Sequence, residues 1–235
     1  MKRVSLIIIS LLMIFCFMSG ATAQDAETRT LGDFHGISVG SIVSAQLHKG
    51  SKNEVAIDVV GFELSDVTTE IEDGVLKVGM KHKKKKFNWA SKNKVNVIIT
   101  YTDDPDQIAV SSSADIIAKD VIKGNSLSLS VSSSGDMKVK VDVDKLIASV
   151  SSSGDLTIKG TANDATVSAT SSADFEGSKL VVQDAELSAS SSADITIHVE
   201  RSPVARASSS ADITYFGSPE KKDISKSGQA DVEGR

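Results

Sequence analysis

The sequence is poor in cysteine, proline and aromatic residues. Its single cysteine, Cys16, lies near the N-terminus, and the 235 residues include three prolines, one Trp and two Tyr. Without a second cysteine the chain cannot form an internal disulfide, so packing alone has to stabilise the fold. Because aromatic residues make up only 4% of the sequence, there are few rings on which sugars could stack, as they do in carbohydrate-cleaving enzymes.

Excess positive charge is also absent. The formal net charge is -5, and it is more negative without Lys2 and Arg3. Nucleic-acid-binding proteins present a basic surface to phosphate groups, so this mild acidity argues against nucleic acid as a partner. After the first 18 residues no apolar run is long enough to span a bilayer, and we therefore expect no transmembrane segment in the mature chain.

The N-terminus has the composition of an export signal. Met1-Lys2-Arg3 is followed by an apolar stretch over residues 4–18 and by Ser-Gly-Ala-Thr-Ala at 19–23. A basic start, a short apolar run and an Ala-x-Ala ending predict a signal peptide over residues 1–23 and a mature chain of 24–235 outside the cytoplasm, in the periplasm, on the outer-membrane surface or secreted. The alternative is a membrane anchor that is not cleaved. Cys16 lacks the Leu-x-small context of a lipoprotein, which argues against a lipid anchor.

One phrase recurs along the second half of the chain. Residues 110–116 read V-S-S-S-A-D-I, residues 131–137 read V-S-S-S-G-D-M, and a degenerate copy occupies 225–232. The intervals between the aspartates are 21, 19, 19, 20, 18 and 19 residues. A near-constant interval is typical of stacked repeats. The aspartates of the seven copies are Asp115, Asp136, Asp155, Asp174, Asp194, Asp212 and Asp231.

Within each copy, apolar and polar residues alternate with a period of two. Leu127, Leu129, Val131, Ser133 and Gly135 share one parity, and serines occupy the other. This alternation predicts strands, and a unit of about 19 alternating residues predicts one coil of a parallel β-helix. We expect an all-β, right-handed solenoid, with right-handed winding as the general preference of parallel strands. The same parity predicts that Ser133 and its equivalents point inward, each bonded to the serine in the next coil.

Two regions are predicted within the β-helix domain, residues 24–235. Residues 106–235 should form the regular coils. Residues 24–105 lack the phrase but contain strand-like alternation over 34–47, 55–59 and 95–101, and a hairpin turn at Asp73-Gly74. We expect these residues to form irregular first coils that cover the open end of the stack.

In register, the seven aspartates would form an outward column. Neighbouring carboxylates about 4.8 Å apart repel by about 0.9 kcal/mol in water, so some interaction has to offset the repulsion. Hydrogen bonds from nearby backbone N–H groups or serine hydroxyls, as in Asx turns, are the favoured explanation. The alternative, a row of Ca²⁺ ions, is disfavoured because Ca²⁺ takes six to eight oxygen ligands and single carboxylates supply few. We therefore expect no metal site and no cofactor.

One charge run interrupts the N-terminal region. Lys81-His82-Lys83-Lys84-Lys85-Lys86 is followed by Phe87 and Trp89. A solvated loop is the simplest interpretation. The alternative is a contact for anionic polymers, phosphate groups or a membrane surface. The candidate contact residues are Lys83, Lys84, Lys85, Lys86 and Trp89.

Catalytic patterns are missing from the sequence. There is no G-x-S-x-G motif, the serines of the repeats are equivalent, and His35, His48, His82 and His198 lack the spacing of a zinc site. We therefore expect a protein that is not an enzyme.

The recurring S-S-x-D-I phrase resembles that of the putative auto-transporter adhesin, head GIN domain family, exported bacterial proteins common in the Bacteroidetes. The resemblance extends from Phe34-His35-Gly36-Ile37-Ser38-Val39 to Ser-Gly-Gln-Ala-Asp-Val at 227–232, and includes Leu47-His48-Lys49-Gly50 and Gly74-Val75-Leu76-Lys77-Val78. It implies a right-handed parallel β-helix and no catalytic residues.

The sequence thus predicts an exported cell-envelope protein with a structural, adhesive or surface-display role. The alternative is a periplasmic or surface module that binds glycan or another anionic ligand through the lysine run at 81–86 or the aspartate column. The expected partner is a component of the cell surface or envelope. Oligomeric state and the identity of a ligand are not specified by the sequence.

Overall fold

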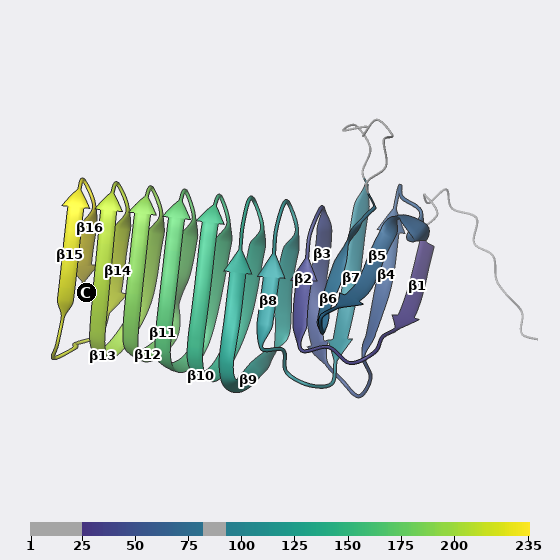
Figure 1. Cartoon of the computed structure of the whole chain (residues 1–235), viewed down its shortest axis with the longest axis horizontal. Coiled ribbons are helices and arrows are strands. Elements are labelled where there is room, and N and C mark those ends of the chain that lie inside the picture. Colours follow the sequence, from purple (N-terminus) through teal and green to yellow (C-terminus); the bar gives the residue numbers. More distant parts are fainter. Residues whose placement is uncertain (1–24, 82–92) are drawn as a thin grey trace, which may run out of the picture.

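The chain forms a stack of flattened coils in parallel β-structure (Figure 1). The computed structural model describes residues 25–81 and 93–235. Outside these ranges lie the predicted signal peptide and the candidate contact residues, namely the lysines at 83–86 and Trp89. The signal peptide and the contact role of these residues therefore stay predictions. The strands of the regular coils are β8 (Gln107–Val110), β9 (Asp115–Val131), β10 (Asp136–Ser152), β11 (Asp155–Ser171), β12 (Asp174–Ser191), β13 (Asp194–Ser209), β14 (Asp212–Phe216), β15 (Asp223–Gly228) and β16 (Asp231–Gly234).

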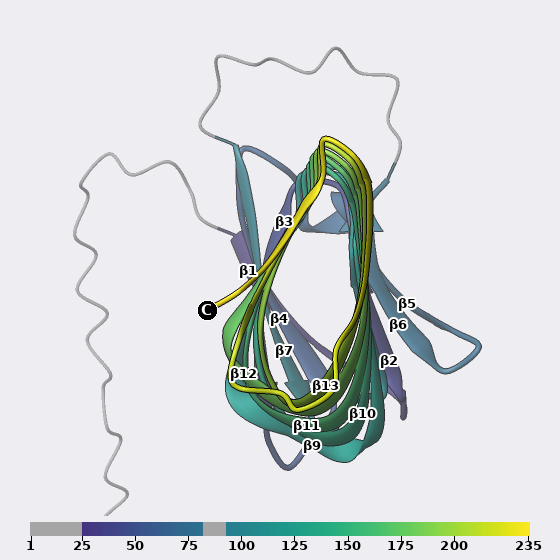
Figure 2. The same ribbon diagram turned by 90° about the vertical axis from the view of Figure 1, so that its left-hand side faces the viewer.

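Each of the strands β9 to β13 runs around one coil and pairs in parallel with the next. Asp136 pairs with Asp155, and Val150 pairs with Ala169, at equivalent positions of successive copies. Seen along the stack, the coils superpose as narrow ovals with one tight corner and one rounded bend (Figure 2). The predicted solenoid of parallel strands, with equivalent residues above one another, is confirmed.

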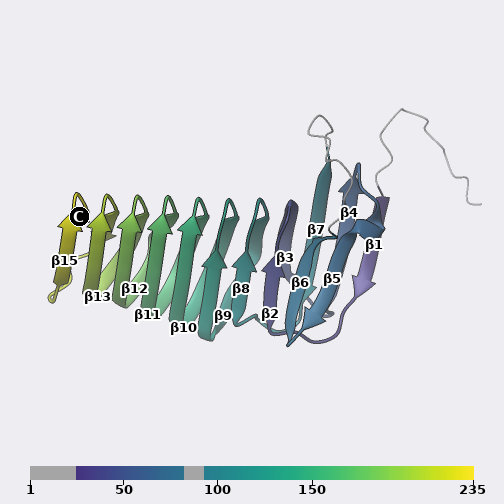
Figure 3. The same ribbon diagram turned by 45° about the horizontal axis from the view of Figure 1, so that its top comes forward.

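The N-terminal residues add strands to both sheets of the stack. Their elements are β1 (Asp25–Thr30), β2 (Gly36–Val39), β3 (Val43–Lys49), β4 (Glu54–Val60), the 3-10 turn η1 (Leu64–Asp66), β5 (Val67–Glu72), β6 (Val75–Met80) and β7 (Lys94–Tyr101). One sheet continues as β1-β4-β7-β3-β9, where β4 is antiparallel to both β1 and β7. The other sheet includes β2 and β8 and ends in the antiparallel β5–β6 hairpin, at the same end of the stack (Figure 3).

A single arginine connects the two sheets at this end. The guanidinium of Arg29, on β1, donates hydrogen bonds to the carbonyl oxygens of Leu64 and Val67 at 2.9 and 2.8 Å. Phe62 and Leu64 pack against the end of the core. These contacts cover apolar residues that an open coil would expose to water.

The tight corner is formed by the three residues between the first residue of each phrase and its Ala or Gly, which are three serines in most copies. The middle serine has a left-handed backbone, with φ of 63° at Ser133 and 65° at Ser152, and its side chain is exposed. The prediction that Ser133 points inward is therefore wrong. A strand that turns back within three residues needs one residue outside the β region, and that residue breaks the alternation. Val131 and Gly135, on either side of the corner, are both buried, so the parity resumes after it.

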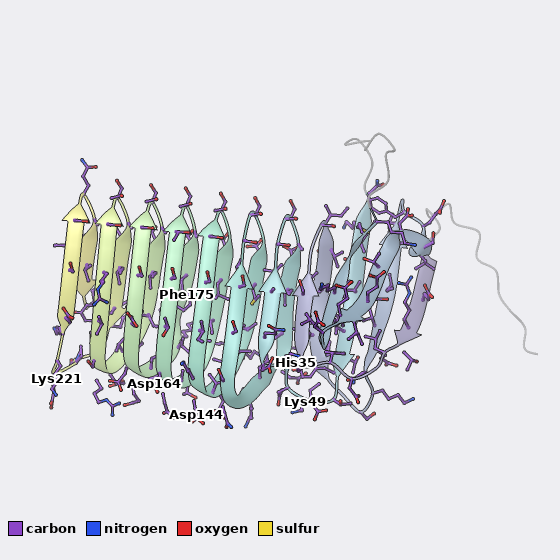
Figure 4. The ribbon with its side chains drawn as sticks, viewed as in Figure 1. His35, Lys49, Asp144, Asp164, Phe175 and Lys221 are labelled. Carbon is purple, nitrogen blue, oxygen red and sulfur yellow. The ribbon has the colours of Figure 1, made fainter. Side chains whose placement is uncertain are left out.

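The space between the two sheets is filled by apolar side chains whose volumes compensate along the strand. Phe175 is 2% exposed and lies inside the stack (Figure 4). Gly177, two residues later, also faces inward, and a Cβ atom built there would lie 2.6 Å from the Phe175 ring. The aligned residues Ile158 and Ile197 are larger. The ring of Phe175 thus occupies the volume that a side chain at 177 would need.

Candidate functional site

The outward face of the sheet containing β1, β4, β7, β3 and the first arms of β9 to β14 and β16 is called here the aspartate face. Outward side chains of successive strands lie side by side on it, in rows that run along the stack, because the strands are in register. The first row, the acid row, comprises Asp115, Asp136, Asp155, Asp174, Asp194, Asp212 and Asp231. The second row comprises Ile98, Gln46, Ile117, Lys138, Thr157, Glu176, Thr196, Thr214 and Glu233.

The predicted hydrogen bonds to the aspartates are present near the ends of the acid row. The Ser44 hydroxyl donates to Oδ2 of Asp115 at 3.0 Å. At the other end, Asp212 accepts from the backbone N–H of Asp231, while Asp231 accepts from the N–H of Val232 and from Nζ of Lys226 at 2.8 Å. Lys226 and this N–H lower the pKa of Asp231.

In the middle of the row the prediction is wrong. Within residues 93–235, Asp155, Asp174 and Asp194 accept no hydrogen bond from a backbone N–H or a serine hydroxyl. The reason is that the corner N–H groups bond the preceding coil: Ser153 N–H donates to Ser133, and Asp155 N–H to Gly135. These donors are therefore not available to the carboxylates.

The unrelieved repulsion is visible at Asp136. Partial burial raises the pKa of its carboxyl group, and the negative charges of Asp155 and Asp115 and a hydrogen bond with Asp155 raise it further. Elsewhere the fold places opposite charges in adjacent coils, for example Lys123 with Asp142 at 3.6 Å. The acid row, by contrast, stacks like charges in seven successive coils.

The cap-side depression is a hollow of about 900 Å³ on the aspartate face, where the N-terminal strands join the coils. It extends across the outward surface of β1, β4, β7, β3, β9 and β10. Ile98 and Ile117 are 44% and 37% exposed within it. Its polar lining includes Thr28, Ser44, Gln46, Asp58, Asn96, Asp115, Asp136 and Lys138.

The acid row continues into this depression in a form that sequence analysis did not reveal. Asp115 pairs with Ser44, Ser44 with Asn96, and Asn96 with Asp58. Residues 39–45 form an eighth corner, in which Ser41 has φ of 69°. Their sequence, V-G-S-I-V-S-A, is only weakly similar to the repeated phrase, so it was a weak signal for this extension. Nothing in the sequence places Asn96 or Asp58 beside it, because β7 pairs with β3 outside the repeats and β4 is added antiparallel to β7.

A second hollow, the lysine-lined depression, of about 450 Å³, adjoins the first and shares Ile117 and Lys138 with it. Lys140 pairs with Lys159, and Lys159 pairs with Lys179, so three ammonium groups follow one another along the sheet. Across the described ranges none of these lysines forms an ion pair; Nζ of Lys140 donates to the carbonyl oxygen of Lys119 at 3.1 Å.

The described ranges contain no side-chain cluster typical of a metal site. No three His, Cys, Asp or Glu side chains converge there in a way that could hold a metal ion. Nδ1 of His35 lies 2.9 Å from Asp106, which raises the pKa of the imidazole. His198 contacts Glu200 at 2.9 Å. Both histidines form pairs at the surface, outside the two depressions.

The architecture is that of a parallel β-solenoid whose N-terminal end is closed by antiparallel strands, with no helix long and apolar enough to span a bilayer between residues 25–81 or 93–235. The sequence profile of the putative auto-transporter adhesin, head GIN domain family matches residues 33–219, and the chain belongs to this family. The resemblance noted in the repeats is thereby confirmed. The family description indicates a surface or adhesive role outside the cytoplasm, in line with a protein that is not an enzyme.

Solved structures share the fold at low sequence identity. A putative adhesin from Bacteroides fragilis has a TM-score of 0.79 and 20% identity, over 92% of this chain and 98% of that one. A putative adhesin from Parabacteroides merdae has a TM-score of 0.69 and 22% identity, over 90% of this chain and 96% of that one. A putative lipid binding protein from Parabacteroides distasonis has a TM-score of 0.67 and 21% identity, over 90% of this chain and 96% of that one. Among proteins of curated function, none matches the chain.

Proposed function

We propose that this chain is an exported adhesive protein of the cell envelope and that the aspartate face is its contact surface. The observation that carries the proposal is the acid row, which places a carboxylate on this face in seven successive coils. The cap-side depression of about 900 Å³ opens on the same face. A stack of coils joined by paired strands is stiff, and along the acid row it repeats the same carboxylate from coil to coil. Such a surface is suited to weak contacts made many times over.

The serine face, defined as the outward surface of the other sheet, is the natural comparison. One row of outward residues in its coils consists of Ser130, Ser149, Ser168 and Ser188, which are small and uncharged, and continues with Arg206. Both predicted roles, structural and adhesive, require the stack. An adhesive role requires in addition that one face be used more than the other.

Reversing charge on one face at a time tests the proposal. Beads coated with the protein are measured for attachment to cell envelopes. We expect the double variant Asp155→Lys and Asp174→Lys to lose most attachment, because it disrupts the acid row. The matched double variant Ser168→Lys and Ser188→Lys, in the same two coils, should attach like the parent. Equal attachment by both variants, with both folded, would show that the aspartate face is not the contact surface.

A second candidate function is the binding of an anionic ligand such as an acidic glycan. The lysine-lined depression favours it, since Lys140, Lys159 and Lys179 follow one another and are free of ion pairs among the described residues. The lysine run at 81–86 remains a further candidate for the same role. Changing Lys159 and Lys179 to glutamine should weaken binding to polygalacturonate and make what remains less dependent on salt. Unchanged binding by this variant would remove the depression from consideration.

A further inference from the structure

The cap-side depression contains two exposed isoleucines among its polar side chains, on a sheet face that is exposed to solvent. Outward residues of a one-sided sheet normally face water and are hydrophilic. Five large apolar side chains are exposed in the described part of the chain, and two of them, Ile98 and Ile117, lie here. They belong to strands on either side of β3 and flank Gln46, with about 9.6 Å between those strands. Together they form a small apolar platform.

Polar groups with unused hydrogen-bonding capacity surround this platform. Asn96 and Gln46 are exposed, and within residues 25–81 and 93–235 their side-chain amides make no hydrogen bond. Each amide offers both donors and an acceptor. Oδ1 of Asp58 is buried and has no hydrogen-bond partner among the described residues. Because this oxygen is not open to solvent, the amides of Asn96 and Gln46 are the groups of this set that a ligand reaches directly.

The depression has the composition of a small-molecule site on a rigid base. Its volume of about 900 Å³ is comparable to that of known ligand pockets, which reach about 1,000 Å³ and combine apolar walls with a few polar groups. The strands β4, β7, β3 and β9 are each paired on both sides. A peptide lying over these four strands therefore cannot bind by adding a strand to the sheet. The terminal strand β1, which pairs with β4 alone among the described strands, borders the depression and is the place where a strand could be added.

Charge restricts the kind of ligand. Asp58, Asp115 and Asp136 line the depression together with Glu27, and Lys138 is the cation among its lining residues. An acidic ligand would be repelled by these carboxylates. An uncharged molecule with an apolar face and many hydroxyl groups would meet both the isoleucines and the amides.

From these features we infer that the cap-side depression binds the uncharged sugar units of a glycan. The C–H face of a pyranose ring lies against Ile98 and Ile117, and its hydroxyl groups bond to the amides of Asn96 and Gln46. The inference rests on the proposed adhesive function for its biological setting, but the binding itself can be measured separately.

The test is binding of the purified protein to a panel of immobilised oligosaccharides. The panel contains neutral gluco-, manno- and galacto-oligosaccharides, N-acetylhexosamine oligomers, polygalacturonate and heparin, together with an unstructured peptide. We expect binding to at least one neutral sugar series. Ile117→Asn and Asn96→Ala should each weaken that binding by about tenfold, the effect of removing one well-packed contact.

Two matched controls come from outside the depression. Ile147, on the serine face, is 39% exposed, close to the 37% of Ile117, so Ile147→Asn removes the same side chain from a similar environment. Asn125 is exposed like Asn96, and Asn125→Ala removes the same amide. Both control variants should bind sugars like the parent. Urea unfolding of all four variants checks that they are folded.

Three results would overturn the inference. These are no binding to any neutral series at millimolar concentration, binding that Ile117→Asn and Asn96→Ala leave intact, or retention of the peptide in preference to every sugar. If sugar binding is confirmed but bead attachment does not depend on the aspartate face, the adhesive function fails and the sugar site remains. The reverse pair of results rejects only the sugar site.

Discussion

Replacing Asp136 with asparagine should stabilise the protein at neutral pH. Asp136 lies between Asp115 and Asp155 in the acid row. With neighbouring strands about 4.8 Å apart, each neighbour repels its carboxylate by about 0.9 kcal/mol in water, so the two together contribute about 1.7 kcal/mol. At 0.15 M salt, with a Debye length of about 8 Å, screening reduces the sum to about 1 kcal/mol. Asparagine removes the charge and keeps the shape, and its amide can donate to Asp155.

The stabilisation should depend on pH in a defined direction. The pKa of Asp136 is raised in the folded state by burial and by its acidic neighbours. As pH falls through this raised pKa, the folded state takes up a proton before the unfolded state does, so the parent protein gains stability. The gain is complete below the ordinary carboxyl pKa of about 4. The advantage of Asp136→Asn should therefore be largest at pH 7 and vanish near pH 3.

Urea unfolding of parent and variant at pH 7 and pH 3, each at low and high salt, measures these differences. Asp231 supplies a control of opposite sign in the same row, because Lys226 and the N–H of Val232 lower its pKa. This stabilising contribution is present above the ordinary carboxyl pKa and is lost as pH falls through the lowered one. Asp231→Asn should therefore destabilise at pH 7. Destabilisation by Asp136→Asn at pH 7, or a gain that neither acid nor salt abolishes, would refute electrostatic repulsion as the cause.

Three further substitutions test the corner, the core and a buried hydroxyl by urea or thermal unfolding. Ser152→Val should lower the free energy of unfolding by about 1–2 kcal/mol more than Ser153→Val, because of these two residues only Ser152 has a left-handed backbone. Equal losses for the two variants would contradict this. Gly177→Ala should destabilise the protein by about 1–3 kcal/mol, because the added Cβ would lie 2.6 Å from the Phe175 ring. Adding Phe175→Leu to the same chain should recover part of this loss. If it recovers none, the volumes of the two side chains do not compensate for each other. Burial first, and then nearby carboxylates, raise the pKa of Tyr101 to about 12, and its hydroxyl has no partner among the described residues. The parent should lose stability above about pH 10, where the unfolded tyrosine ionises first, whereas Tyr101→Phe should not and should be about 1 kcal/mol more stable at pH 7.

The repeated phrase was sufficient to predict the stack. Alternation with a period of two specifies strands, and a recurrence of about 19 residues specifies which residues of successive coils lie together. These are local and periodic properties, so they can be read from the order of residues alone. The pairing of Asp136 with Asp155 followed directly from them. The hairpin at Asp73-Gly74 followed instead from the Asp-Gly turn signal.

The corner and the candidate site were decided by the tertiary structure. Alternation predicts parity but not backbone conformation, so the left-handed turn at Ser133 was missed. Likewise, the cap-side depression combines Asp58, Asn96 and Ser44 from strands that no repeat relates, two of them paired antiparallel. Contacts between segments far apart in sequence depend on how the chain folds back at the closed end of the stack. The N-terminal residues lack the repeat, so its period does not predict which of them are neighbours.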